Sequence, residues 1–167
     1  HLLLFYADEQ AVGSVAKNEA VKIKFEVDIN PPAFAGLEHK YRLLPVPYEL
    51  CLYDMPSLFA GKIHAVICRA WKNRIKGRDL YDYVFYLSKG TAFNQRHLRA
   101  RLMDSGYIAE DAECSLDEIK RILRERFDKI DFSKARKDVE PFIHDTSVLD
   151  IWSTEFFKQI TEGLKAI

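Results

Sequence analysis

Five charged side chains between residues 62 and 82 have the types and spacing that phosphate chemistry requires. Lys62 and Arg69 are seven residues apart, so in a helix they share one face. Asp79 and Asp82 are three residues apart, so in a helix their carboxylates are neighbours, and Arg78 directly precedes them. Cationic side chains bind phosphate oxygens, and a carboxylate can position a lysine or accept a proton. Each residue alone also has a structural explanation, because acids in a first turn stabilise a helix and an arginine can pair with a nearby carboxylate.

A second acidic pair, Glu26 and Asp28, belongs to a stretch that alternates strictly between apolar and polar residues from Val21 to Ile29. This period of two predicts a half-buried strand with both carboxylates on its polar face. Gly13-Ser14 precedes the pair at about the spacing found in the metal-binding motif of polymerase-β-type nucleotidyltransferases. Two interpretations follow: the metal motif itself, or a turn followed by a separate strand. In both, Asp28 is the best metal-ligand candidate, although an exposed pair balanced by nearby lysines is the structural alternative.

The charge of the chain is unevenly distributed although the formal net charge is zero. Residues 62–101 contain ten Lys or Arg and two acids, whereas residues 104–118 contain six acids and no base. Such blocks are either solvated helix faces or, for the basic block, an anion-binding surface for phosphates or nucleic acid. The basic run Lys72, Arg74 and Lys76 would attract an RNA acceptor through salt-dependent phosphate contacts.

The elements that must position these residues form an α+β fold. Residues 1–7, 21–29 and 45–54 are expected to be strands, and a loop is expected between the last two. From Pro56 onward the periodicity is helical, with an apolar stripe formed by Phe59, Ile63, Val66, Ile67 and Ala70. Five helices are expected, in segments 57–76, 78–90, 93–106, 115–130 and near 152–167. The prediction is a strand-rich part over 1–55, containing a small N-terminal β-sheet, and a helical C-terminal region over 56–167.

Local signals sharpen the helix ends and exclude several kinds of site. Ser115 with Glu118 forms a capping box, Thr154 is expected to be the N-cap of the last helix, and Gly77 is expected to act as a helix breaker. No phosphate-binding glycine loop and no nucleophile elbow occur, and the histidines lack paired ligand spacing. Three cysteines without a CxxC motif favour a reducing, cytoplasmic location, and no segment has the length of a membrane span.

Several separated motifs occur in the order found in a known family of bacterial toxins. From about Lys22 to its end, the chain resembles the AbiEii/AbiGii family, which are nucleotidyltransferase-like toxins of type IV toxin–antitoxin (abortive infection) systems. The motifs that carry the resemblance are Lys24–Asp28, Leu58–Lys62, Arg69, Lys76–Asp82, Asp138–Ile143 and Ile151–Ser153.

The resemblance implies a role for each candidate residue. In this family the Gly-Ser…Asp-x-Asp motif lies upstream, so Glu26-Val27-Asp28 resembles the later strand, and Asp28, with Glu26, would complete an Mg²⁺ site. Lys62 would contact the phosphates of a nucleoside triphosphate (NTP), and Arg69 and Arg78 would orient phosphates or brace the acidic residues. Asp79 or Asp82 would position Lys62 or act as a base, and the sequence does not distinguish the two.

The same resemblance implies an acceptor and a partner, and it leaves an alternative open. The acceptor would be an RNA (tRNA-like) or a protein, and the partner a cognate antitoxin. The first two metal carboxylates of the family motif are not found, so this segment alone is expected to be inactive. The alternative is a non-catalytic module that binds nucleic acid or the antitoxin through a basic helical face. An enzyme requires Lys62, Asp28 and Asp79 or Asp82 to converge on one cleft, whereas a binding module requires only the basic face.

Overall fold

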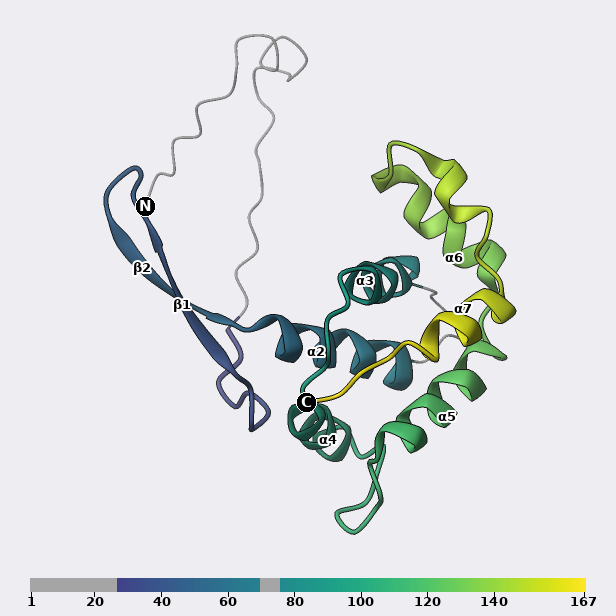
Figure 1. Ribbon diagram of the computed structural model, residues 1–167, viewed down its shortest axis with the longest axis horizontal. Helices are drawn as coiled ribbons and strands as arrows, with labels where there is room; N and C mark the ends of the chain where they lie inside the picture. The colour runs from purple at the N-terminus through teal and green to yellow at the C-terminus, as the bar shows by residue number, and fades with distance from the viewer. Residues whose placement is uncertain (1–26, 70–75) are drawn as a thin grey trace, which may run out of the picture. The chain divides into compact units, whose positions relative to one another are not determined.

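Figure 1 shows a computed structural model of the chain, which describes residues 27–69 and 76–167. The chain divides into two compact units, His1–Pro31 and Pro32–Ile167. The strand expected over 1–7 and the larger part of the one over 21–29 lie outside the described residues. The predicted division of the chain at residues 55 and 56 stays a prediction.

The prediction that the strand continues to Ile29 is wrong for residues 27–29. Residues 27–29 are not in a strand, and Val27 and Ile29, which were expected to face a core, are 83% and 94% exposed. The Asp28 carboxylate instead accepts a hydrogen bond from the Asn30 backbone N–H at 3.0 Å. A local side-chain bond of this kind competes with strand pairing, and the prolines that follow supply no donors.

The described sheet is a two-stranded antiparallel hairpin. Strand β1 (Leu37–Arg42) pairs with β2 (Tyr48–Tyr53) in a register that sets Leu37 opposite Tyr53. The prediction of a strand over 45–54 is confirmed by β2, but β1 was expected to be a loop. Its sequence, LEHKYR, lacks strict alternation, and its strand conformation comes from pairing with β2. Across the hairpin, the Tyr41 hydroxyl donates to the Glu49 carboxylate at 3.1 Å.

Six α-helices and two short 3₁₀ helices follow among the described residues, so the α+β prediction is confirmed. The α-helices are α2 (Met55–Cys68), α3 (Gly77–Ser88), α4 (Gln95–Asp104), α5 (Leu116–Phe127), α6 (Phe132–Val139) and α7 (Thr154–Thr161). The 3₁₀ helices are η1 (Glu140–Phe142) and η2 (Thr146–Leu149). Within the described ranges, none of these helices combines the length and apolar character needed to cross a membrane. Helix α6 was not predicted.

The helix ends follow from capping side chains. Helix α2 begins earlier than expected, because the Asp54 carboxylate accepts the Ser57 N–H at 2.8 Å. The Ser115 cap of α5 is confirmed, with its hydroxyl accepting the Glu118 N–H at 3.3 Å. The cap of α7 is Ser153 and not Thr154, because the Ser153 hydroxyl accepts the N–H three residues later.

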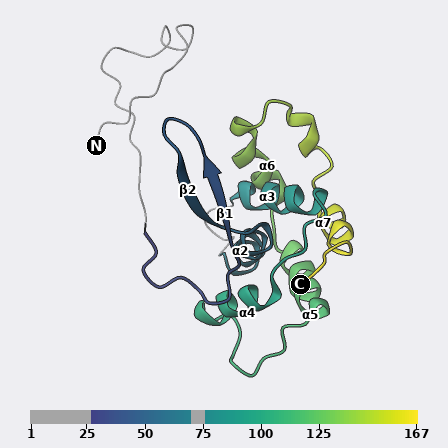
Figure 2. The same ribbon diagram turned by 60° about the vertical axis from the view of Figure 1, so that its left-hand side comes forward.

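Helix α2 lies at the centre of the helical part, in contact with α3, α4 and α5 (Figures 1 and 2). Its predicted apolar stripe is confirmed, since Phe59, Ile63, Val66 and Ile67 are all fully buried, while Ala70 lies outside the described residues. This burial fixes the rotation of α2 about its axis, and therefore decides which polar side chains of the helix remain accessible.

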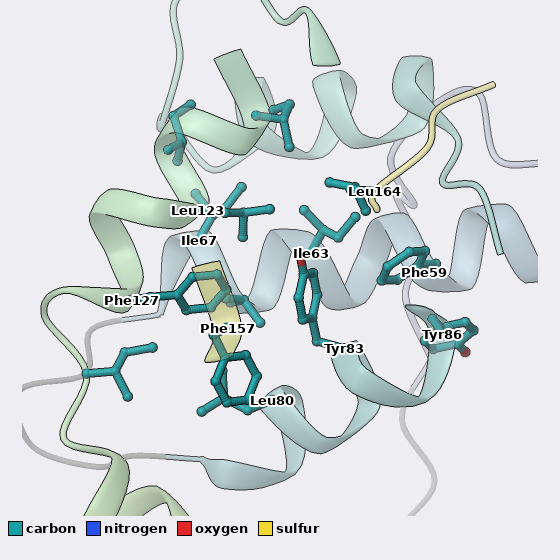
Figure 3. Packing of buried hydrophobic residues seen from close by; sticks show 14 of the residues in the cluster. Phe59, Ile63, Ile67, Leu80, Tyr83, Tyr86, Leu123, Phe127, Phe157 and Leu164 are labelled. Carbon is teal, nitrogen blue, oxygen red and sulfur yellow. The ribbon is translucent and has the colours of Figure 1, made fainter. Parts of the chain in front are cut away.

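An aromatic cluster joins α3, α5 and α7 next to α2 (Figure 3). The rings of Tyr83 and Phe127 lie 5.9 Å apart, and those of Phe127 and Phe157 lie 5.3 Å apart. The Thr161 hydroxyl donates to the Phe157 carbonyl at 2.7 Å, so its oxygen accepts from the Tyr83 hydroxyl at 2.8 Å. Burial raises the pKa of Tyr83, which keeps this hydroxyl protonated as the donor. The cluster therefore anchors α3, the helix that carries both candidate aspartates.

Candidate functional site

Lys62 and Asp82 form an ion pair between α2 and α3. The Lys62 Nζ lies 2.6 Å from the Asp82 Oδ2, and 38% and 36% of the two side chains are exposed. An ion pair that is accessible to this degree contributes little to folding stability, about 0–1 kcal/mol. The ion pair holds the Lys62 ammonium group in one place and leaves it accessible to a ligand.

Arg69, the C-cap residue directly after α2, forms a second ion pair with Asp79 in the first turn of α3. The Arg69 Nε lies 3.0 Å from the Asp79 Oδ2, and Asp79 is buried. The geometry does not align this contact as a hydrogen bond, so among the described residues Oδ2 has no hydrogen-bond partner. Burial raises the pKa of Asp79, and Arg69 followed by Lys62 act against that rise.

The two pairs answer a question that the sequence left open. Asp82 is the aspartate in contact with Lys62, whereas Asp79 contacts Arg69. The packing of α2 against α3 decides which aspartate meets which cation. The structure thus brings together Lys62, Arg69, Asp79 and Asp82.

A cleft of about 510 Å³ opens beside these pairs, with walls from β2, α2, α3 and α4. Lys62, Arg69 and Asp79 line it, together with a third cation, Arg101 from α4. Three cations and one carboxylate give the cleft a positive balance. Its volume lies in the range typical of small-molecule sites. The arrangement suits a compact anion such as a phosphate chain.

Two histidines also line the cleft. His97 is buried on α4, and its Nδ1 lies 2.8 Å from the Ala33 carbonyl, which fixes Nδ1 as the protonated nitrogen. His64 on α2 has its pKa lowered, first by burial and then by the charge of Arg101, while a hydrogen bond with the Arg101 backbone acts against this lowering. His64 is therefore neutral at pH 7.

Sequence reasoning missed Arg101, His64 and His97 as site residues. The histidines were considered only as metal ligands, and Arg101 was one of ten cations in the basic block. Spacing gave no signal for His64, because residues two apart in a helix, such as Lys62 and His64, do not share a face.

The remaining candidates are not brought to this cleft by the structure. Arg78 does not line it, and the Arg78 guanidinium lies 4.9 Å above the ring of Phe142. Asp28 belongs to the other unit, so its convergence with Lys62 stays a prediction. Glu26, Lys72 and Arg74 lie outside the described residues, and Lys76 immediately precedes α3. Within residues 27–69 and 76–167, no three His, Cys, Asp or Glu side chains cluster closely enough to hold a metal ion.

We expect Arg69→Ala to lower the free energy of unfolding by about 2 kcal/mol at pH 7, because it leaves the buried Asp79 carboxylate without its counter-charge. The cost is below that of a fully buried pair because Arg69 is partly exposed. The folded-state pKa of Asp79 is already raised, and it rises further without Arg69. Protonation of Asp79 therefore removes the unpaired buried charge from the variant. Its deficit relative to wild type should therefore shrink as the pH falls from 7 to 5.

Urea unfolding followed by circular dichroism at both pH values measures this effect. The matched control is the double variant Arg69→Ala/Asp79→Asn, which removes the charge and should recover stability relative to the single variant at pH 7. Equal deficits for the single and double variants at both pH values would mean that the pair has no electrostatic role.

The fold and the cleft define an α+β protein with a cation-lined cleft of ligand size. A family model described as the nucleotidyl transferase AbiEii toxin of a type IV toxin–antitoxin system matches residues 3–159, so the chain belongs to this family. A search of curated proteins and a search of solved structures each found no match. The membership confirms the resemblance found in the sequence. It implies an antitoxin partner, and it suggests an NTP substrate, usually with a divalent metal.

Proposed function

We propose that this chain belongs to an enzyme that transfers a nucleoside monophosphate from an NTP to a hydroxyl group of an RNA (tRNA-like) or protein acceptor. The acceptor oxygen forms a new bond to the α-phosphorus and loses its proton to solvent, the bond from that phosphorus to the bridging oxygen breaks, and pyrophosphate leaves with the electron pair. The cleft formed by α2, α3 and α4 binds the phosphates of the NTP.

One observation carries this proposal: three residues of the family motifs, Lys62, Arg69 and Asp79, line one cleft of ligand size, and Asp82 holds Lys62. A binding module with a basic face needs no such convergence. Phosphoryl transfer is catalysed mainly by positioning and by charge stabilisation, so fixed cations are the groups that it requires.

In this proposal, each carboxylate positions one cation. Lys62 contacts a phosphate as a point charge, and Asp82 keeps it there. Asp79 holds Arg69, whose guanidinium offers its remaining N–H groups to a second phosphate oxygen. Both aspartates thus act through their cations, and neither is assigned to proton transfer.

The divalent metal is Mg²⁺ in this proposal, with Asp28 and Glu26 as its ligands from this chain, as the family resemblance implies. Such an ion would neutralise the charge that develops on the phosphates. Among the described residues of its own unit, Asp28 is the only carboxylate. These residues therefore do not form a complete metal site. We therefore assign no step of the reaction to the ion.

We expect Lys62→Ala to weaken NTP binding about tenfold or more, because the variant loses a charged contact to phosphate. Calorimetric titration of the chain with ATP, GTP, CTP and UTP in the presence of Mg²⁺ measures the affinity. Lys158→Ala is a close control, since Lys158 also lies 2.6 Å from an aspartate, Asp128, and has a similar exposed fraction of 36%.

The expected result is a loss of affinity in Lys62→Ala and none in Lys158→Ala. If both variants bind NTP as the wild type does, the nucleotide does not occupy this cleft. If the wild type binds tRNA but no NTP, and Lys62→Ala leaves tRNA binding unchanged, the chain acts as the basic binding module instead.

A further inference from the structure

Arg101 differs from the other two cations of the cleft in having no carboxylate partner. Lys62 pairs with Asp82 and Arg69 pairs with Asp79, whereas in the described part of the chain no ion pair involves Arg101. Arg101 is half-buried, and its Nε is a buried donor without a hydrogen-bond partner among the described residues. A buried charged donor left without a partner is costly, so its presence in a cleft indicates a ligand.

The absence of a side chain at Gly61 leaves room for the Arg101 guanidinium. A Cβ atom added at Gly61 would lie 3.8 Å from the Arg101 Cζ and 4.0 Å from its Nε, so the guanidinium packs against the bare surface of α2 at this residue. Gly61 directly precedes Lys62, and both Lys62 and Arg101 line the cleft. Two cations from different helices therefore face one small space.

His64 lies beside Arg101 and forms a hydrogen bond with the Arg101 backbone. Its Nε2 is buried and has no hydrogen-bond partner in the described residues, as is also true of the Arg101 Nε. The charge of Arg101 acts on His64, so the two side chains are close enough to interact. The unpartnered Arg101 Nε–H is the free donor for an anion, and the hydrogen bond between His64 and the Arg101 backbone keeps the two residues side by side.

We propose that Arg101 forms a phosphate subsite that binds the outer phosphates of the NTP, beside the phosphate held by Lys62. This inference rests on the proposed function. The planar guanidinium matches a phosphate through two parallel hydrogen bonds, whereas a lysine supplies only a point charge. A triphosphate is favoured over an RNA backbone as the source of the phosphate, because the unpaired atoms are buried within a cleft of ligand size and do not lie along an open surface.

Calorimetric titrations with inorganic triphosphate, an NTP and the matching nucleoside monophosphate test this subsite. Arg101→Gln should weaken binding of the NTP and of inorganic triphosphate about ten- to a hundredfold, the range expected for lost hydrogen bonds to a charged group. Binding of the monophosphate should change less than about threefold, because that ligand lacks the outer phosphates.

Arg96→Gln is the matched control. Arg96 lies on the same helix and carries the same charge, but it is exposed, stacks on Phe34 at 4.5 Å and does not line the cleft. Thermal unfolding of both variants checks that each is folded. Affinities of folded Arg101→Gln that equal those of the wild type for all three ligands would overturn the subsite.

These titrations distinguish failure of the subsite from failure of the proposed function. If the wild type binds NTP and Lys62→Ala abolishes binding while Arg101→Gln does not, the proposed function stands and the subsite fails. If the wild type binds inorganic triphosphate through Arg101 but shows no preference for a nucleotide, the subsite stands and the proposed NTP substrate fails. If Arg101→Gln weakens binding of a short RNA and not of the NTP, the phosphate comes from an acceptor and the inference is overturned.

Discussion

Phe157→Ala should lower the free energy of unfolding by about 3–5 kcal/mol, the cost of removing a fully buried phenylalanine ring. The Phe157 side chain is 0% exposed and stacks on Phe132 with ring centroids 5.0 Å apart. It also meets Phe127 at 5.3 Å and Trp152 edge-on at 5.4 Å. Since rings from several helices surround it, no single neighbour can move to fill the cavity. A loss of this size is a large part of the 5–15 kcal/mol typical of a folded domain.

Chemical unfolding followed by circular dichroism measures the loss, and Phe142→Ala is the control. Phe142 is 67% exposed, so its truncation should cost less than about 1 kcal/mol. A cost for Phe157→Ala no greater than that for Phe142→Ala would show that the cluster is not the core of this unit.

The aromatic cluster also matters for the cleft. Tyr83 lies in the cluster next to Asp82 in the chain, and its buried hydroxyl is bound to Thr161 of α7. The packing of α3 against α7 thus places Asp79 and Asp82 where Lys62 and Arg69 meet them. A destabilised cluster would weaken NTP binding without touching the cleft itself.

The part of the site that depends on spacing within single helices was predictable from the sequence. Lys62 of α2 and its C-cap residue Arg69 lie on one side because of the helical repeat, and Asp79 and Asp82 are neighbours on α3 for the same reason. The apolar stripe beginning at Phe59 indicated which face of α2 is buried. These inferences need no knowledge of how the helices pack.

The part that depends on packing between helices was not predictable. Arg101 reaches the cleft only because α4 lies against α2, and nothing in its local sequence distinguishes it from Arg99 or Arg96. Strand β1 exists because β2 pairs with it. The partner of each aspartate required the angle and register of α2 against α3, which tertiary contacts set.

Gly77 is a residue that the sequence singled out but whose packing role it did not predict. Its place in the sequence predicts a helix breaker, but it is the first residue of α3, directly after the Lys76 cap. A Cβ atom at Gly77 would lie 2.0 Å from the Ala135 carbonyl oxygen and 2.6 Å from the Val139 Cγ2, both on α6. The glycine therefore permits the close approach of α3 and α6. Because α6 was not predicted, the sequence offered no reason for a glycine in contact with it.

We expect Gly77→Ala to lower the free energy of unfolding by about 3 kcal/mol, because the nearest atom belongs to the backbone of α6 and cannot rotate away. Alanine is the better helix former by up to about 1 kcal/mol, so helix propensity alone predicts the opposite sign. Gly61→Ala is the matched control, since its Cβ would meet only ordinary contacts from 3.8 Å outward. That variant should be neutral or more stable in the same urea titration.

Comparing Gly77→Ala with Gly61→Ala distinguishes a packing role of Gly77 from a role in ligand binding. Asp79 and Asp82 follow Gly77 by two and five residues, so a displaced first turn should also weaken NTP binding by shifting the partners of Arg69 and Lys62. If Gly77→Ala destabilises the fold and Gly61→Ala does not, the glycine of the Lys-Gly-Arg-Asp motif is explained by the contact between α3 and α6. If Gly77→Ala leaves stability unchanged but abolishes binding, that glycine acts at the ligand, and the close contact with α6 is not what requires it.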